Sequence, residues 1–155
     1  MILISKIFCT GFGVGKIPFF PGTLASLSIL PIIWVIKNNQ SIEFFLIVIS
    51  IYLIISYFLI KVCISNESNK DPSYIVVDEH LGQAVTLLFC DEVFIEYLFA
   101  FLLFRFFDIL KPFPINLVDK KIKNGFGVVL DDLLAGVYVL IVIALFGHFF
   151  GLPFE

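Results

Sequence analysis

One apolar run of nineteen residues constrains the fold of this chain more than any other feature. It covers residues 42–60 and contains a single charged side chain, Glu43, close to its start. A helix of this length is about 28 Å long, close to the ~30 Å hydrocarbon core of a bilayer. We therefore predict that residues 42–60 cross a membrane as a helix.

The composition of the whole chain agrees with a membrane setting. Of its 155 residues, 60% are hydrophobic and only 15% are charged, whereas soluble domains carry about a quarter charged residues. A soluble protein with this balance would expose large apolar patches, so a very apolar soluble helical domain is the weaker interpretation. The net charge is −3, and no basic patch with interleaved aromatic residues indicates binding to nucleic acid.

The remaining apolar segments predict an all-α integral membrane bundle. We expect about three to four membrane-embedded helices plus short or re-entrant helices, in one domain covering residues 1–155. Residues 23–36 contain Pro31 and are too short for a full span, residues 81–104 are expected to form a shallow hairpin, and residues 133–150 form the last span. Asp71 and Pro72 resemble the start of a further helix that continues to about residue 89.

A glycine-rich segment, residues 11–23, reads GFGVGKIPFFPGT and is predicted to be an irregular loop. It lacks the strand and helix that accompany a dinucleotide-binding loop. Two interpretations stay open: a structural turn, which is favoured, or a nest of backbone N–H groups that binds an anion beside Lys16. Thr23 is predicted to cap the helix that follows.

Basic residues sort to one side of this predicted topology. Lys37 falls on the opposite side from all the others, and the crowded side is cytoplasmic by the positive-inside rule. The crowded side carries Lys6, Lys16, Lys61, Lys70, Arg105, Lys111, Lys120, Lys121 and Lys123. The same side carries Asp78, Glu79 and the acidic residues between Arg105 and Asp132.

Acidic and basic residues beside apolar segments form the candidate site. Charged groups next to hydrocarbon are costly and are usually paired or functional. Arg105, Asp108 and Lys111 are spaced to share one broad side of a helix, which Pro112 and Pro114 end. The predicted catalytic set is Asp78, Glu79, Arg105, Asp108, Lys111, Asp131 and Asp132. His80, beside Glu79, is a weaker candidate that is equally compatible with a position in solvent.

These residue types suit phosphoryl chemistry. Carboxylate oxygens, here without a competing Cys and His set, favour a hard cation such as Mg²⁺. Arginine and lysine suit phosphate oxygens. From the residues alone we predict a metal-dependent enzyme acting on a lipid phosphate at the membrane face. The alternative is a small transporter or channel subunit that uses intramembrane carboxylates, which would require charges distributed through the membrane depth.

Four motifs in order resemble the phosphatidylglycerophosphatase A family, over about residues 11–145. They are PGT at residues 21–23, DPSYIVVDEHLG at 71–82, FRFFDILKPFPI at 104–115 and GFGVVLDDLLAG at 125–136. Two positions depart from the family pattern: Asn124 replaces a common glycine, and Leu24-Ala25 replaces a usual Trp-Gly pair. Both departures concern the shape of loops rather than charged positions.

The resemblance implies a Mg²⁺-dependent phosphatase of the bacterial inner membrane that converts phosphatidylglycerophosphate to phosphatidylglycerol and inorganic phosphate. On the matching positions, metal binding is assigned to Asp78, Glu79, Asp131 and Asp132. Binding of the substrate phosphate is assigned to Arg105 and Lys111, with Lys16 and Thr23 from the glycine-rich segment as further candidates. Asp108 would either orient Arg105 or bind the ion.

Overall fold

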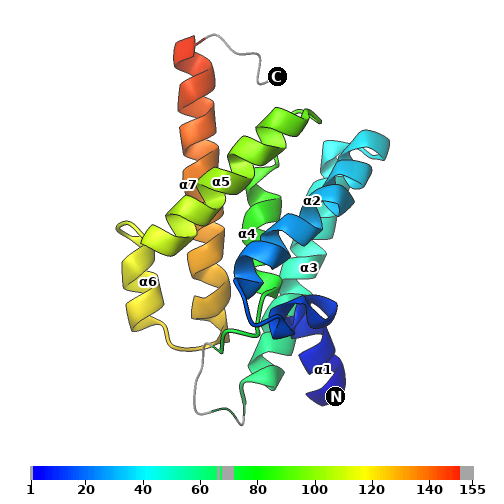
Figure 1. The fold of residues 1–155 in the computed structure, drawn as a ribbon, viewed down its shortest axis with the longest axis vertical. Helices are drawn as coiled ribbons and strands as arrows, with labels where there is room; N and C mark the ends of the chain where they lie inside the picture. Colours follow the sequence, from blue (N-terminus) through cyan, green and yellow to red (C-terminus); the bar gives the residue numbers. More distant parts are fainter. Residues whose placement is uncertain (1, 66, 68–71, 151–155) are drawn as a thin grey trace.

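The computed structural model describes residues 2–65, 67 and 72–150, and these residues form helices and connections without a strand. Figure 1 shows their arrangement. In chain order the elements are α1 (Ile2–Cys9), the 3₁₀ helix η1 (Gly11–Lys16), α2 (Pro21–Asn39), α3 (Ile42–Cys63), α4 (Val77–Thr86), α5 (Phe94–Leu110), α6 (Ile115–Lys121) and α7 (Gly125–Phe150). The predicted all-α bundle is therefore confirmed.

Two helices, α3 and α7, are long and apolar enough to cross a membrane. They run in opposite directions, because Gly125 at the start of α7 lies beside Ile60 and Lys61 near the end of α3 (Figure 1). The helix predicted over residues 42–60 is confirmed. The larger number of three to four embedded helices stays a prediction.

The last helix was predicted to begin near Leu133. It begins at Gly125 instead, because Asn124 caps it. Its Oδ1 accepts hydrogen bonds from the backbone N–H groups of Phe126, at 3.0 Å, and Gly127, at 3.1 Å. These bonds satisfy donors that a helix start otherwise leaves unpaired. Asp131 and Asp132 therefore lie within α7 and not before its first residue.

The start of α2 also differs from the prediction. Phe20, in a left-handed conformation, precedes the first helical residue, Pro21, so that Thr23 lies inside the first turn. The interpretation of Thr23 as the capping residue was wrong, because proline favours the first helical position and fixes the start there. Pro31 does not end the helix, which continues to Asn39.

Helix α4 lies at the centre of the bundle, and nine of its ten residues are buried (Figure 1). It begins at Val77, not near Pro72, because Val76 is held outside the helix by a 2.9 Å hydrogen bond from its N–H to the carbonyl of Cys9. Asp71, the predicted cap, lies outside the described residues.

Two glycines let α4 pack closely against α7, its most extensive partner. A Cβ atom on Gly82 would lie 2.7 Å from the carbonyl oxygen of Asp132, and one on Gly136 would lie 2.6 Å from the carbonyl oxygen of Gly82. Small residues at such crossings allow two backbones to approach. These contacts bring the second turn of α4 against the part of α7 between Asp132 and Gly136.

Candidate active site

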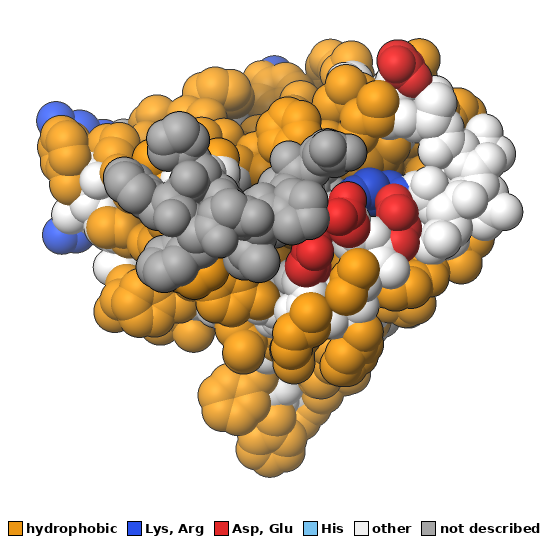
Figure 2. Space-filling view, turned by 90° about the horizontal axis from the view of Figure 1, so that it is seen from above, with side chains coloured by type: hydrophobic (Ala, Val, Ile, Leu, Met, Phe, Trp, Pro, Cys, Tyr) orange, Lys and Arg blue, Asp and Glu red, His pale blue; other side chains and the backbone are white. Residues whose placement is uncertain are grey.

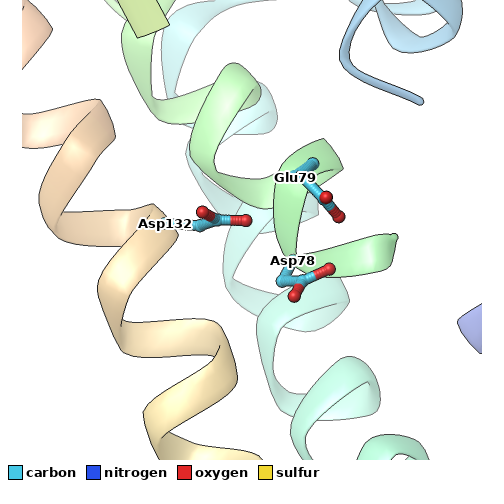
Figure 3. A group of neighbouring side chains, drawn as sticks. All are labelled: Asp78, Glu79 and Asp132. Carbon is cyan, nitrogen blue, oxygen red and sulfur yellow. The ribbon is translucent and has the colours of Figure 1, made fainter. Parts of the chain in front are cut away.

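Three carboxylates meet where α4 crosses α7. Asp78 and Glu79 lie in the first turn of α4, and Figure 3 shows Asp132 extending from α7 toward them. One oxygen from each side chain lies within 4.8 Å of the others. Asp78 and Asp132 are each one helical turn before the glycines of the crossing, Gly82 and Gly136, so the same contact that packs the helices brings the acids together.

A pocket of about 370 Å³ surrounds these carboxylates. Its lining includes all seven predicted catalytic residues together with Thr23, although they come from four helices, α2, α4, α5 and α7, and from the residue that follows α5. The full lining is Phe20, Pro21, Gly22, Thr23, Ser73, Ile75, Asp78, Glu79, Arg105, Asp108, Ile109, Lys111, Val128, Asp131 and Asp132. Lys16, the remaining candidate, is exposed at the end of η1 and does not line the pocket.

Lys111 contributes to the pocket from an unexpected backbone position. Helix α5 ends at Leu110, and Lys111 follows it with φ = 44°, so it does not continue the helical face of Arg105 as predicted. Its Nζ lies 2.7 Å from Asp119 Oδ1 and 2.6 Å from Asp131 Oδ2. Asp131 is therefore held by a lysine and is not part of the three-carboxylate group.

These ion pairs shift the pKa values of Lys111 and Asp119, two groups that lie outside the long helices. Burial opposes the charge on Lys111, but hydrogen bonds to Asp119 and Asp131 outweigh it and raise the lysine pKa above its ordinary value. The hydrogen bond from Lys111 lowers the pKa of the Asp119 carboxyl. At neutral pH the structure thus has a charged lysine between two carboxylates.

Arg105 is positioned by two partners. Its Nη1 donates to Asp108 Oδ2 at 2.8 Å, one helical turn further along α5, and to Ser26 Oγ at 3.3 Å. Ser26 in turn donates to the carbonyl of Gly22 at 3.0 Å, which ties the guanidinium to the start of α2. Of the two roles predicted for Asp108, this geometry shows contact with Arg105.

The packing around Gly22 explains why the PGT motif has a glycine at this position. A Cβ atom at this position would lie 2.2 Å from Glu79 Oε1 and 3.2 Å from Arg105 Nη2. Any side chain would therefore displace the acid or the guanidinium. The first turn of α2 approaches the site closely only because this residue lacks a side chain.

The donor set fits a divalent cation. Three carboxylates within 4.8 Å repel one another unless a positive charge lies between them. Glu79 Oε2 is buried without a hydrogen-bond partner, and buried polar atoms without partners are rare in folded proteins. Burial raises the pKa of the Glu79 carboxyl, and its hydrogen bond with Asp78 and the charge of Arg105 only partly offset this. A hard cation bound by these oxygens would remove both costs.

His80 faces away from the carboxylates. Its Nδ1 lies 3.0 Å from the hydroxyl of Tyr52 on α3, and its Nε2 lies 3.4 Å from Ser28 Oγ on α2. Burial lowers the pKa of His80 to about 4, so the imidazole is neutral at pH 7. The solvent-exposed alternative is therefore wrong, and His80 links three helices behind the pocket.

Sequence reasoning missed Ser26 and Asp119. Ser26 lies one turn after Gly22 on α2, a spacing that could have suggested a position near the PGT motif. Asp119 lies on α6, a separate helix from the α5 end that carries Lys111, so no helical spacing connects them. Only the folded chain shows that the two side chains meet.

Fold and site together define the class of this protein. A helical bundle with two helices able to cross a membrane holds a pocket in which carboxylates and cations converge, as in a membrane enzyme that acts on an anionic group. Residues 7–147 match the family model of Phosphatidylglycerophosphatase A, which covers most of the chain. The chain therefore belongs to this family and is a phosphatase.

Individual relatives are similar to this chain over most of its length. A Haemophilus influenzae protein named Phosphatidylglycerophosphatase A is 36% identical over 138 residues, which cover 88% of this chain and 85% of the relative. The Escherichia coli protein of the same name is 29% identical over 143 residues, which cover 92% of this chain and 83% of the relative. A Bacteroides thetaiotaomicron protein provisionally named a phosphatidylinositol-3-phosphatase is 37% identical, covering 87% and 88%. No solved structure matches the chain.

Proposed function

We propose that this protein hydrolyses phosphatidylglycerophosphate to phosphatidylglycerol and inorganic phosphate with the help of Mg²⁺, as a step of phospholipid biosynthesis. The observation that carries the proposal is the single pocket in which three carboxylates lie beside Arg105 and Lys111. Carboxylates that bind a cation and cations that bind phosphate are the two requirements of phosphoryl transfer. The names of two relatives supply the lipid headgroup.

Asp78, Glu79 and Asp132 are the residues that would hold the ion. Asp131, the fourth predicted ligand, stands beside them and is held by Lys111. Mg²⁺ held by these three acids would polarise a phosphoryl oxygen and offset part of their negative charge. The expected coordination by oxygen atoms alone agrees with the absence of cysteine or histidine among the described lining residues.

Arg105 and Lys111 would bind the oxygens of the terminal phosphate. Arg105 is held by Asp108 and Ser26, so its guanidinium is oriented before the substrate arrives. Asp131, the carboxylate outside the three-acid group, would accept a proton from the attacking water, whose oxygen forms the new bond to phosphorus. The bond between phosphorus and the glycerol oxygen then breaks, and that oxygen leaves as the alcohol after taking up a proton.

The charges indicate how the protein would sit in the inner membrane. Lys61 and the start of α7 lie together at one end of the bundle, and Lys37 lies at the other, beside the end of α4. By the positive-inside rule, the end with most basic residues faces the cytoplasm. The pocket, at the start of α4, would then open near the cytoplasmic face.

Phosphate release from purified protein in detergent tests this function. We expect hydrolysis of phosphatidylglycerophosphate in Mg²⁺ and none in EDTA, with restoration when Mg²⁺ is added back. Phosphatidylinositol 3-phosphate should be assayed in parallel, because the Bacteroides relative carries that name. Hydrolysis of the inositol lipid alone, or hydrolysis that resists EDTA, would contradict the proposal.

A further inference from the structure

The pocket has buried acids and an apolar edge. Asp78 and Asp132, the buried acids of the pocket, are 6% and 4% exposed, whereas Phe20 and Ile109, which line the same pocket, are 77% and 70% exposed. Exposed apolar side chains at the edge of a charged pocket are costly in water. In a bilayer, the same edge would contact hydrocarbon.

This apolar edge is formed by the ends of two helices. Phe20 precedes α2, and Ile109 lies in the last turn of α5, one residue before its end. Phe20 adopts φ = 50° and Lys111 adopts φ = 44°, and these are two of the three non-glycine residues with positive φ in the described part of the chain. Bulky residues rarely adopt this conformation, and such strain is concentrated at functional sites. The strained backbone at Phe20 holds an aromatic ring at the surface of the pocket instead of in the core.

The size of the pocket requires that part of a lipid substrate remain outside. A volume of about 370 Å³ is near the lower end of the ~300–1,000 Å³ range for small-ligand pockets. It suffices for a phosphorylated headgroup but not for two acyl chains. The chains must therefore leave the pocket at some edge. Phe20 and Ile109 provide an apolar edge, whereas Ser73 and Lys111 make other parts of the lining polar.

We propose that Phe20 and Ile109 flank a lateral portal through which the lipid enters from the bilayer. The acyl chains rest on these two side chains while the phosphate reaches the carboxylates and Arg105. This inference rests on the proposed lipid phosphatase function and adds the residues that recognise the hydrophobic part of the substrate. Phe20 and Ile109 are thus specificity-determining residues and not catalytic ones.

A comparison of two substrates with the same phosphorylated headgroup tests the portal. One has long acyl chains and is presented in mixed micelles, and the other has four-carbon chains and is water-soluble. The variant is Phe20→Asn, because asparagine tolerates a positive φ and removes the apolar ring. Phe94→Asn is the matched control, since Phe94 is 74% exposed at the start of α5 and does not line the pocket.

We expect Phe20→Asn to lower the ratio of kcat/KM for the long-chain over the short-chain substrate about tenfold, mainly through KM of the long-chain lipid. Phe94→Asn should leave this ratio unchanged. An equal loss for both substrates, or no loss for either, would overturn the portal while the wild-type activity still supported the phosphatase function. If wild type hydrolyses neither substrate, the proposed function fails, and the portal fails with it.

A second measurement covers the case that Phe20→Asn does not fold. Wild-type protein is irradiated with a long-chain lipid phosphate that carries a photoreactive group on an acyl chain, and the cross-linked peptides are identified by mass spectrometry. Cross-links at residues 19–21 and 108–110 that inorganic phosphate competes away would support the portal. Labelling confined to α3 and the distal half of α7 would overturn it.

Discussion

Charged side chains are buried at both ends of α4, but their partners differ. The start of α4 is the site end, and the end of α4, near Thr86, is the far end. At the far end, the ammonium of Lys37 donates to the carbonyl of Leu87 at 2.9 Å and to the carbonyl of Cys90, and it lies 3.7 Å from Glu92. Figure 2 looks onto this end and shows acidic side chains around a basic one within a mostly hydrophobic surface. Carbonyls that a helix end leaves unpaired are thus satisfied by one cation.

At the site end, charges of the same sign are placed together instead. Asp78, Glu79 and Asp132 converge, and Glu79 Oε2 and Arg105 Nε are buried without hydrogen-bond partners. A buried polar atom left unpaired costs about 1–3 kcal/mol. The charges at the far end therefore stabilise the fold, whereas the site end leaves polar groups available for a ligand. The two ends should therefore respond differently to substitution.

The largest effect is expected for Asp132→Asn. The change removes one of three proposed ligand carboxylates and should lower kcat by more than about 100-fold, since even indirect partners of a metal contribute about 10–100-fold. Because it also removes a repulsive charge, thermal unfolding without Mg²⁺ should occur at the same or a higher temperature.

Glu96→Gln at the far end is the matched control for this prediction, since Glu96 accepts a hydrogen bond from the Asp91 N–H outside the pocket. Its phosphate release should equal that of wild type. An Asp132→Asn protein that keeps more than a tenth of the activity would remove Asp132 from the ion-binding set.

Gly82→Ala tests whether close packing brings the acids together. The added methyl group would lie 2.5 Å from the Phe104 ring and 2.7 Å from the carbonyl oxygen of Asp132. Overpacking of this kind costs about 1–3 kcal/mol, and the separation of α4 from α7 should also weaken Mg²⁺ binding measured by calorimetry. Ser50→Ala on the exposed side of α3 should change neither quantity. Normal ion affinity in Gly82→Ala would show that the crossing tolerates a wider spacing.

The sequence predicted which residues line the site better than it predicted which of them contact one another. Metal binding is assigned to Asp78, Glu79, Asp131 and Asp132 because they match the acidic positions of the family motifs. The structure brings Asp78, Glu79 and Asp132 together. Asp131 is assigned with Asp132 because both match the Asp-Asp pair of the same motif. Adjacent residues point about 100° apart on a helix, and Asp131 instead meets Lys111.

Helix boundaries were harder to predict than helices. Asn124 and Phe20 decide where α7 and α2 begin, the first through side-chain hydrogen bonds and the second through a left-handed backbone. The Val76 N–H bonds to Cys9, and this contact between distant residues delays the start of α4. Tertiary contacts of this kind leave no local pattern in the sequence.

Lys37→Met tests whether the cation at the far end of α4 stabilises the fold. Methionine keeps the aliphatic stem but leaves the carbonyls of Leu87 and Cys90 without their donor, which should lower the free energy of unfolding by about 1–3 kcal/mol. Activity per folded molecule at low temperature should stay near that of wild type, because the pocket is at the other end of α4. Lys37→Arg retains a cation and should lose less stability. A loss of activity as large as that of Asp132→Asn, without a loss of stability, would erase the distinction between the two ends.

Asp119→Asn is expected to have the smallest effect and sharpens the description of the site end. Asp119 holds Lys111 from α6 but does not line the pocket, so it acts by positioning the lysine. Loss of its charge should leave Lys111 held mainly by Asp131 and reduce kcat/KM about tenfold, within the range for partners that orient active-site groups. Asp119→Glu should restore part of the activity, because it returns the carboxylate. The control is Glu67→Gln, which weakens a 3.5 Å ion pair with Lys6 outside the pocket and should leave kcat/KM unchanged. If Asp119→Asn behaves like this control, Lys111 is positioned by its backbone and Asp131 alone.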